Sequence, residues 1–450
     1  MTLGARRLDA DGLADLQAGV VRAISHPTSH YLFVRLDRAD GARRLLRHLL
    51  PAVVGGASWG SDKPSIVRNV ALSSEALRRL SVPDAQIQVF GEAFTDGMAK
   101  RAAFIGDTGP SDPSNWVSAF AAREAHLLVW LHGESLDVLR ADAARWRAVV
   151  VDAGLTVAHE QEASMHEGMR EHFGFADGAG QPLIDGATPA AGQSGTFSAA
   201  LTSIRDRSLA AGEFVLGYAD SLGVVAPAAR SVLGQCSTMF VFRQLAQHVE
   251  RFRSVTAASA AAAGLAPDVL RAKLVGRWPD GTPLALWPEG PPPRGTPDQA
   301  GAVFDFADDP LGARCPLGAH IRRANPRDAL LSGKVTTRHR VIRRAMPYGA
   351  LLPDGAPDDG VERGLMFGCF NASIERQYEF VQRNWLNDGS RVLRGDERDP
   401  IVASPGGSGR FLLGGYPPRV VEGLEPFVTC RGGEYYLLPG RAALAALAWS

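Results

Sequence analysis

The sequence predicts an α+β protein in which helices pack on antiparallel sheets, and two observations favour this class. Strand-like and helix-like segments alternate between residues 8 and 160, and several connections are short enough for hairpins rather than parallel crossovers. The 450 residues also exceed the roughly 250–300 at which one hydrophobic core stops growing. We therefore expect two domains, over residues 1–165 and 166–450. The short connections favour an α+β sandwich over a doubly wound parallel sheet.

The first half of the chain carries the clearer pattern. Apolar runs bounded by turn residues favour strands, whereas apolar residues at intervals of three and four favour amphipathic helices. The expected strands cover 30–36, 66–72 and 126–132. The expected helices cover 8–24, 42–50, 74–80 and 136–153.

The second half repeats this style with longer loops. Its expected strands cover 213–217 and 239–244. Its expected helices cover 245–252, 267–275, 375–385 and 440–449. The proline-rich segment 279–298 predicts a long loop, and loops of this length often have a function.

Composition and charge exclude several classes of partner. Lysine plus arginine total 48, as do aspartate plus glutamate, so neither nucleic acid nor an anionic membrane surface is expected. The four cysteines are far apart, which disfavours a disulfide framework or a cysteine zinc site. No apolar signal segment and no run of about 18 apolar residues occurs, so we expect a soluble, cytoplasmic protein, although an unconventional export route stays open.

Asp177 lies in a glycine-rich segment, EHFGFADGAGQP. Gly174, Gly178 and Gly180 bracket the aspartate, and glycines permit unusual backbone angles and the close approach of a flat ligand. A carboxylate on such a turn can be held rigidly in a cavity. A turn in which Asp177 caps nearby backbone groups is the alternative that this segment alone leaves open.

Two later segments carry a histidine and an arginine of interest. In RCPLGAHIRRANPR, small and apolar residues precede His320, a pattern that suits an axial haem ligand with Arg322 and Arg323 near the propionates. In RHRVIRRAMPYG, a strand-like pair precedes Arg343, whose fixed fork of donors suits a peroxide or propionate oxygen. A satisfied core histidine and a solvated basic strand are the alternatives.

Taken together, these segments resemble the dye-decolorizing peroxidase family, in its longer bacterial and fungal forms. The family's Gly-x-x-Asp-Gly motif is met at 174–178, and the histidine and arginine segments follow in the family's order. The resemblance runs over nearly the whole chain. Further similar stretches are LADLQAGV, NVAL, KLVGRWPDGTPL, RGLMFGCFNASIERQYEFVQRNW and FVTCRGGEYYLL.

This resemblance implies a pair of ferredoxin-like domains that enclose one non-covalent haem b. It implies His320 as the axial ligand of the iron and Asp177 as the distal acid–base residue. Arg343 matches the distal arginine because it stands four residues before the proline of the MPYG turn, a register that fits better than Arg344.

The resemblance also implies residues around the haem. Gly178, Leu365 and Phe367 would line the pocket. Asp399 would accept the N–H of the axial histidine, with Glu375 and Glu379 as rival partners.

The implied residue types suit peroxide chemistry. Hydrogen peroxide must lose a proton at one oxygen and gain one at the other, and a single distal base can carry that proton. Aspartate is ionised at neutral pH but is a weaker base than histidine, so acidic conditions should favour activity. Arginine stabilises the negative charge on the leaving oxygen.

The electron donor is open. The implied pocket is small and apolar, so we hypothesise that bulky dyes are oxidised at the surface through Trp385 or Tyr348, with packing as the alternative role. The sequence gives neither the physiological donor nor the oligomeric state. A haem-binding, haem-storage or porphyrin-handling module is the alternative function, which the pair of Asp177 and Arg343 disfavours because storage needs only the axial histidine.

Overall fold

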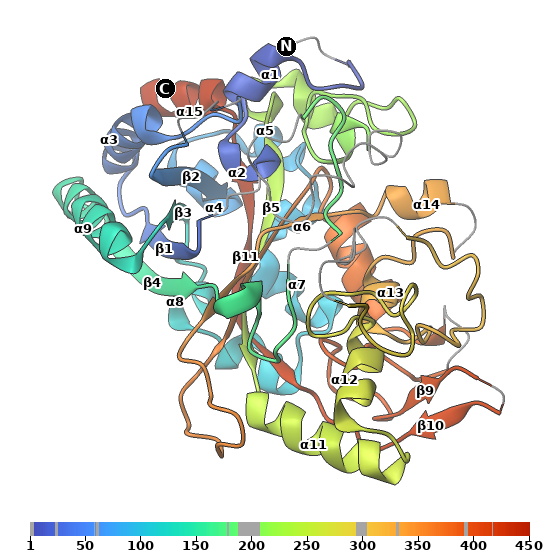
Figure 1. The fold of residues 1–450 in the computed structure, drawn as a ribbon. Helices are drawn as coiled ribbons and strands as arrows, with labels where there is room; N and C mark the ends of the chain where they lie inside the picture. Colours follow the sequence, from blue (N-terminus) through green and yellow to red (C-terminus); the bar gives the residue numbers. More distant parts are fainter. Residues whose placement is uncertain are drawn as a thin grey trace.

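The central sheet of the molecule is built from both halves of the chain (Figure 1). The computed structural model describes residues 4–22, 26–57, 59, 63–177, 180–187, 208–293, 304–329, 333–390, 395–415 and 417–450. Within them, nine strands form one antiparallel sheet in the order β4-β1-β3-β2-β11-β5-β8-β6, with β7 also paired to β8. The strands are β1 Thr28–Arg35, β2 Ile66–Ser73, β3 Leu127–Gly133, β4 Thr156–Ser164, β5 Thr238–Gln247, β6 Ile342–Arg343, β7 Met346–Tyr348, β8 Gly364–Asn371 and β11 Val428–Leu438.

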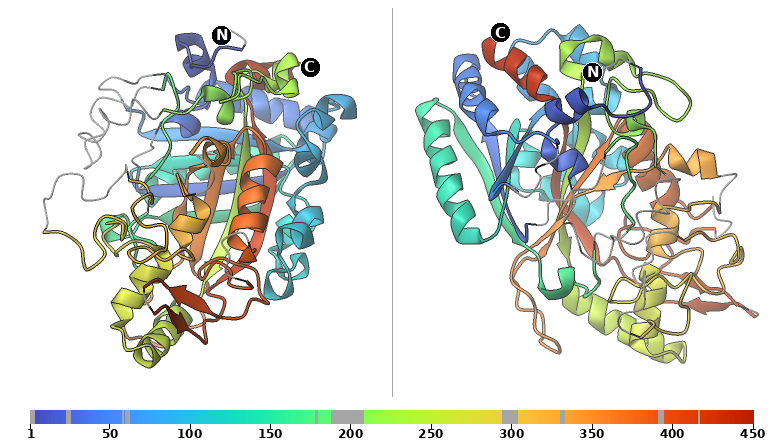
Figure 2. Two further views of the ribbon diagram at one scale, coloured as in Figure 1. Left: turned by 90° about the vertical axis from the view of Figure 1, so that its right-hand side faces the viewer. Right: turned by 45° about the horizontal axis from the view of Figure 1, so that its top comes forward.

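This sheet folds into two half-sheets that pack on each other. β4-β1-β3-β2 forms the first and β11-β5-β8-β6 the second, and they join where β2 pairs with β11 over only two residue pairs. Tyr31 and Phe33 of β1 lie with ring centroids 5.8 and 5.0 Å from that of Phe242 of β5, so the faces of the half-sheets are in contact. Figure 2 (left) shows the blue strands of the first half-sheet running across the green, orange and red strands of the second.

Helices cover the outer faces. α3, α9 and α15 lie against the first half-sheet, whereas α11 to α14 lie on the side of the second (Figure 1). The α-helices are α1 Ala10–Asp15, α2 Ala18–Val21, α3 Ala39–Leu49, α4 Ser74–Arg79, α5 Asp84–Gln88, α6 Glu92–Asp96, α7 Met98–Ile105, α8 Ser118–Ala121, α9 Leu136–Asp152, α11 Val249–Ala262, α12 Pro267–Val275, α13 His320–Ala324, α14 Gly333–Thr337 and α15 Arg441–Trp449. Two π-helical turns, η9 Glu375–Glu379 and η10 Val381–Leu386, follow β8, and a small hairpin joins β9 Phe411–Leu413 to β10 Arg419–Val421.

The predicted α+β class is confirmed, and most predicted elements are present within a few residues. The confirmed strands are those expected at 30–36, 66–72, 126–132 and 239–244. The confirmed helices are those expected at 42–50, 74–80, 136–153, 267–275, 375–385 and 440–449. The described part of the 279–298 loop, up to residue 293, contains neither a helix nor a strand.

Three predicted elements are wrong. The helix expected at 8–24 is split into α1 and α2, because the Gln17 side chain between them binds Val70 and the Pro439 carbonyl. The strand expected at 213–217 is a 3₁₀ turn followed by further turns, since Glu213 turns inward to Arg376. The helix expected at 245–252 begins only at α11, because β11 extends the pairing of β5 to Gln247.

The pairing of β2 with β11 makes one sheet of strands from residues 1–165 and 166–450. The division of the chain into domains at that point therefore stays a prediction. None of the helices in the described part of the chain is both long and apolar enough to cross a bilayer.

Candidate active site

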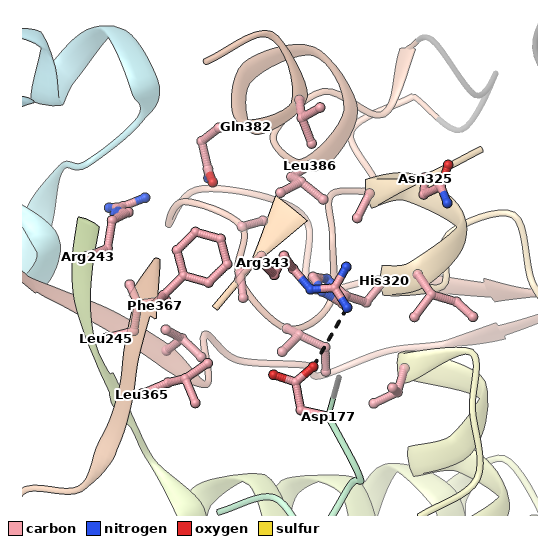
Figure 3. Close-up of a pocket in the computed structure, with 18 of the residues that line it drawn as sticks. Asp177, Arg243, Leu245, His320, Asn325, Arg343, Leu365, Phe367, Gln382 and Leu386 are labelled. Atoms are coloured by element: carbon pink, nitrogen blue, oxygen red, sulfur yellow. Dashed lines mark ion pairs between the residues drawn. The ribbon is translucent and has the colours of Figure 1, made fainter. Parts of the chain in front are cut away.

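A cavity of about 310 Å³ lies on the outer face of the second half-sheet (Figure 3). Successive side chains of a strand point to opposite faces of its sheet. β5 therefore directs Arg243, Leu245 and Gln247 into the cavity, whereas Phe242 packs between the half-sheets. The alternation along one strand thus builds the core and the cavity wall at the same time.

β8 supplies the apolar part of the same wall. Leu365 pairs with Leu245 and Phe367 pairs with Arg243, and both β8 side chains line the cavity. The structure thus places these two predicted pocket residues together. The third, Gly178, lies outside the described residues.

His320 lines the cavity as the first residue of α13. Its Nδ1 lies 2.9 Å from Oδ2 of Asp399, whose side chain is fully buried. The second oxygen of Asp399 accepts hydrogen bonds of 2.9 Å from the N–H groups of Ile401 and Val402. The backbone thus holds the carboxylate in place, and the carboxylate in turn fixes the orientation of the imidazole.

The pair also shifts the two pKa values. Burial disfavours the charged form of each group, but their mutual attraction and hydrogen bond outweigh it. The pKa of His320 is raised and the pKa of Asp399 is lowered. The rival carboxylates are engaged elsewhere, since Glu375 accepts the N–H of Ala93 at 2.8 Å and Glu379 pairs with Arg101 at 2.6 Å.

Asp177 and Arg343 face each other at the cavity (Figure 3). Oδ1 of Asp177 lies 3.7 Å from Nη2 of Arg343, and the side chains are 27% and 34% exposed. Both groups are thus open to the cavity and close enough to act on one small molecule. Gly174 and Gly180, which flank Asp177, have φ angles of 96° and 74°, as the glycine pattern predicted.

The neighbouring arginines are placed differently. Arg344 donates to the carbonyls of Gly19 and Val20 and does not line the cavity, so position 343 faces the cavity. The prediction that Arg322 and Arg323 lie near the propionates is wrong. Both are buried away from the cavity by bonds to Asp309 and Glu397 and to backbone carbonyls, which satisfy the guanidinium donors.

Other arginines give the cavity a positive charge. Arg277, Arg327 and Arg340 line it together with Arg343. Burial, and then repulsion by Arg343, lower the pKa of Arg277 and of Arg340 to about 10. An anionic group bound in the cavity would relieve this repulsion.

Sequence reasoning missed two polar pairs of the cavity. The carboxylate of Glu171 accepts hydrogen bonds from the N–H of Phe175, at 2.8 Å, and from the amide of Gln247, at 2.5 Å. Arg243 forms a buried ion pair with Asp107. Only the alternation along β5 could have pointed to Arg243 and Gln247, because their partners are distant in the sequence.

These residues fit a haem group. Within the part of the chain that the structure describes, Nδ1 of His320 makes the hydrogen bond to Asp399, which leaves Nε2 for a metal. Leu365 and Phe367 offer an apolar surface to a flat macrocycle, and the cluster of arginines suits its carboxylates.

Comparisons with known proteins show which family the chain belongs to. The C-terminal model of the Dyp-type peroxidases matches residues 304–396. Peroxidase 2 of Mycetinis scorodonius is 30% identical over 468 aligned positions, which cover 96% of this chain and 86% of that protein. The chain belongs to the dye-decolorizing peroxidase family.

Two further relatives of this peroxidase support the assignment. The dye-decolorizing peroxidase msp1 of Mycetinis scorodonius is 29% identical, covering 85% of this chain and 77% of that protein. A solved dye-decolorizing peroxidase in complex with 2,6-dimethoxyphenol is 25% identical, covering 97% of this chain and 99% of that one with a TM-score of 0.80. The ferredoxin-like fold and the haem-dependent peroxidase activity with hydrogen peroxide, both predicted from the resemblance, are confirmed.

Proposed function

We propose that this peroxidase binds one non-covalent haem b in the cavity and reduces hydrogen peroxide with Asp177, Arg343 and His320. Organic donors such as dyes and phenolics then return the electrons in one-electron steps. One observation carries the proposal: the Asp399-bound imidazole and the pair of Asp177 with Arg343 line the same cavity.

His320 is the axial iron ligand in this proposal. Its Nδ1–H donates to Asp399, which fixes the tautomer and leaves the lone pair of Nε2 for the metal. The carboxylate also makes the imidazole a stronger electron donor. Asp399 is thereby the partner of the axial histidine, in preference to Glu375 and Glu379.

Haem held by His320 would supply the redox chemistry, namely an iron that passes electrons from the donors to hydrogen peroxide. Asp177 takes a proton at its carboxylate from one peroxide oxygen and delivers it to the other. The guanidinium of Arg343 donates to the leaving oxygen and stabilises its negative charge. The separation of 3.7 Å between the two side chains lets both reach one peroxide molecule.

Leu365 and Phe367 have a different role in the proposed site. Their apolar side chains line the cavity and exclude water and bulky molecules from the space beside Asp177 and Arg343. We include small phenols among the donors, because a relative has been solved in complex with 2,6-dimethoxyphenol. Gly178 follows Asp177 in the sequence, and we include it among the proposed haem contacts only because it is part of the Gly-x-x-Asp-Gly motif.

Rapid mixing of the purified, haem-loaded protein with hydrogen peroxide tests the proposal. We expect one haem per chain and a change in the Soret band within milliseconds, followed by recovery when a phenol is added. A bound haem whose spectrum does not respond to peroxide would instead support a haem-storage or porphyrin-handling module. Failure to bind haem would reject both.

A further inference from the structure

An open hollow lies on the surface beside one end of the cavity, where α7, η10 and the segment 398–405 come together. In η10, Gln382 and Leu386 point to the cavity (Figure 3), whereas Arg383 of η10 and Asn387, the residue that caps its end, line the hollow. One helical segment therefore serves both spaces. The hollow is lined by Ala103, Phe104, Gly106, Thr108, Arg383, Asn387, Arg398, Ser404 and Pro405.

Hydrogen bonds fix the walls of this hollow. The side-chain amide of Asn387 donates to the carbonyl of Ile105 at 2.9 Å and accepts the N–H of Ser404 at 2.8 Å. Arg398 donates to the carbonyls of Ser404 and Pro405 at 3.1 and 2.7 Å. The shape is therefore set by the fold and does not depend on a ligand.

The hollow combines an aromatic ring with positive charge. Phe104 is 46% exposed, and the guanidinium of Arg383 lies 3.7 Å from the centre of its ring. Arg101 also lies over this ring, but its charge is matched by Glu379. In the described part of the chain, no carboxylate pairs with Arg383 or Arg398.

Only a thin wall separates the hollow from the cavity. Gly106 and Ser404 line both spaces. Gly106 has a φ angle of 88°, and a Cβ there would overlap Oγ of Ser404, so the two residues are in close contact. Gly106 and Ser404 would therefore lie between a molecule in the hollow and the cavity in which the haem is proposed to bind.

We propose that this hollow is a binding site for electron donors that are aromatic anions, such as aryl carboxylates and aryl sulfonates. The ring would stack on the planar guanidinium of Arg383, and the anionic group would pair with Arg383 and Arg398. This inference rests on the proposed function, because the donor must meet an oxidised enzyme. When such a donor also carries a phenolic hydroxyl, two donor molecules each lose one electron and one proton, and one hydrogen peroxide is reduced to two water molecules, which leaves two phenoxyl radicals.

Binding tests the site without turnover. The probe is naphthalene-2-sulfonate, titrated calorimetrically into the haem-loaded protein and into two variants. Arg383→Gln should weaken binding about tenfold, since a hydrogen bond to a charged group is worth about 1.5 kcal/mol. The matched control is Arg145→Gln, because Arg145 is also exposed and stacked on a ring, 5.1 Å from that of Trp146, but lies on α9. The control should bind like the wild type.

Kinetics test the role in donor oxidation. The probes are guaiacol and vanillate, which differ by one carboxylate. In Arg383→Gln, the ratio of kcat/KM for vanillate to kcat/KM for guaiacol should fall about tenfold, and in Arg145→Gln it should keep its wild-type value. Added salt should reduce the difference between the wild type and Arg383→Gln.

The outcomes separate this inference from the proposed function. Equal binding of the sulfonate and an equal donor ratio in Arg383→Gln and the wild type would overturn the donor site, while peroxide reduction would stand. A wild-type protein that oxidises neither donor would overturn the proposed function. In that case the titration alone would still decide whether the hollow binds aromatic anions.

Discussion

The side-chain amide of Gln181 is bonded to both backbone groups of Arg343. Its Oε1 accepts the N–H of Arg343 at 3.0 Å, and its Nε2 donates to the carbonyl of Arg343 at 3.2 Å. Gln181 stands four residues after Asp177, so this pair of bonds ties the segment of the proposed base to the strand of the proposed arginine. We infer that these bonds help to hold the two proposed catalytic groups, Asp177 and Arg343, at their separation of 3.7 Å.

Replacement of Gln181 tests this dependence. Gln181→Leu removes both bonds and should lower the rate of reaction with hydrogen peroxide by about tenfold or more, because small displacements of catalytic groups cost large factors in rate. Gln181→Glu keeps an acceptor for the N–H of Arg343, so its rate with hydrogen peroxide should lie between the rates of Gln181→Leu and the wild type. Stopped-flow absorbance measures the rate, and haem content serves as the control. A wild-type rate in Gln181→Leu would show that the bonds do not position Arg343.

The proton transfer assigned to Asp177 predicts a larger effect. Asp177→Asn keeps the size of the side chain but removes the basic oxygen, so the rate with peroxide should fall by about 10²–10⁴. The absorption spectrum of the resting enzyme should stay close to that of the wild type. Asp354→Asn, an exposed aspartate that pairs with Arg253 at the surface, is the matched control. A fast Asp177→Asn variant would place the base elsewhere.

The axial role of His320 predicts loss of the cofactor. His320→Ala removes the imidazole whose Nδ1 is held by Asp399, and the protein should retain haem poorly or with an altered spectrum. Asp399→Asn should keep the haem but shift the spectrum, because the neutral amide holds the imidazole less strongly. Haem content and the Soret maximum of the purified variants measure both effects. Full retention of haem with an unchanged spectrum in His320→Ala would reject the axial assignment.

Local signals pointed to these candidate residues, but each left an ordinary structural role open, and the family resemblance was needed to choose them. Glycines bracket Asp177, small residues precede His320, and a strand and a turn surround Arg343. The positive φ angles of Gly174 and Gly180 show that the glycine signal had a real backbone cause.

The residues that were missed depend on contacts between distant parts of the chain. Asp107 meets Arg243 across 136 positions, and no local pattern marks either residue. The extension of β5 to Gln247 likewise results from its pairing with β11, which a local helical pattern cannot reveal. The expectation for Arg322 and Arg323 failed because charge near a ligand histidine says nothing about which way each side chain turns.

Two buried histidines should make the fold less stable under acidic conditions, although a carboxylate base favours activity there. Nδ1 of His126 accepts the N–H of Leu36 at 2.9 Å, so the bond requires the neutral imidazole. Burial, and then the charge of Arg79, lower the pKa of His126 to about 4, and burial lowers the pKa of His172 to about 4 as well.

This shift predicts how stability depends on pH. An unfolded histidine has a pKa of about 6.5, so the unfolded chain binds more protons between pH 6.5 and 4. The stabilisation that comes from keeping these histidines neutral is therefore complete above pH 6.5. It is lost as the pH falls from 6.5 to 4, by up to about 1.4 kcal/mol per pH unit for each histidine. His126→Gln, which can still accept the N–H of Leu36, should flatten the decline of the free energy of unfolding in urea between pH 6.5 and 4.5. An unchanged slope would show that His126 does not carry the effect.

Trp385 and Tyr348, the proposed relays for bulky donors, are both buried and neither lines the cavity. The ring of Trp385 lies 5.1 Å from that of His339, and the hydroxyl of Tyr348 donates to Glu362 at 2.9 Å. A tyrosine that loses an electron must also lose its proton, and Glu362, which is 42% exposed, can accept it.

A bulky dye distinguishes a relay from simple packing. Trp385→Phe and Tyr348→Phe each keep an aromatic ring, so a packing role predicts unchanged kinetics with every donor. A relay role predicts a severalfold fall in kcat for a dye too large for the cavity, while the rate of reaction with hydrogen peroxide keeps its wild-type value. Steady-state dye bleaching and stopped-flow absorbance measure the two quantities on the same samples. Unchanged dye turnover in one variant rejects that residue as a relay, and unchanged turnover in both would require a route through another part of the surface.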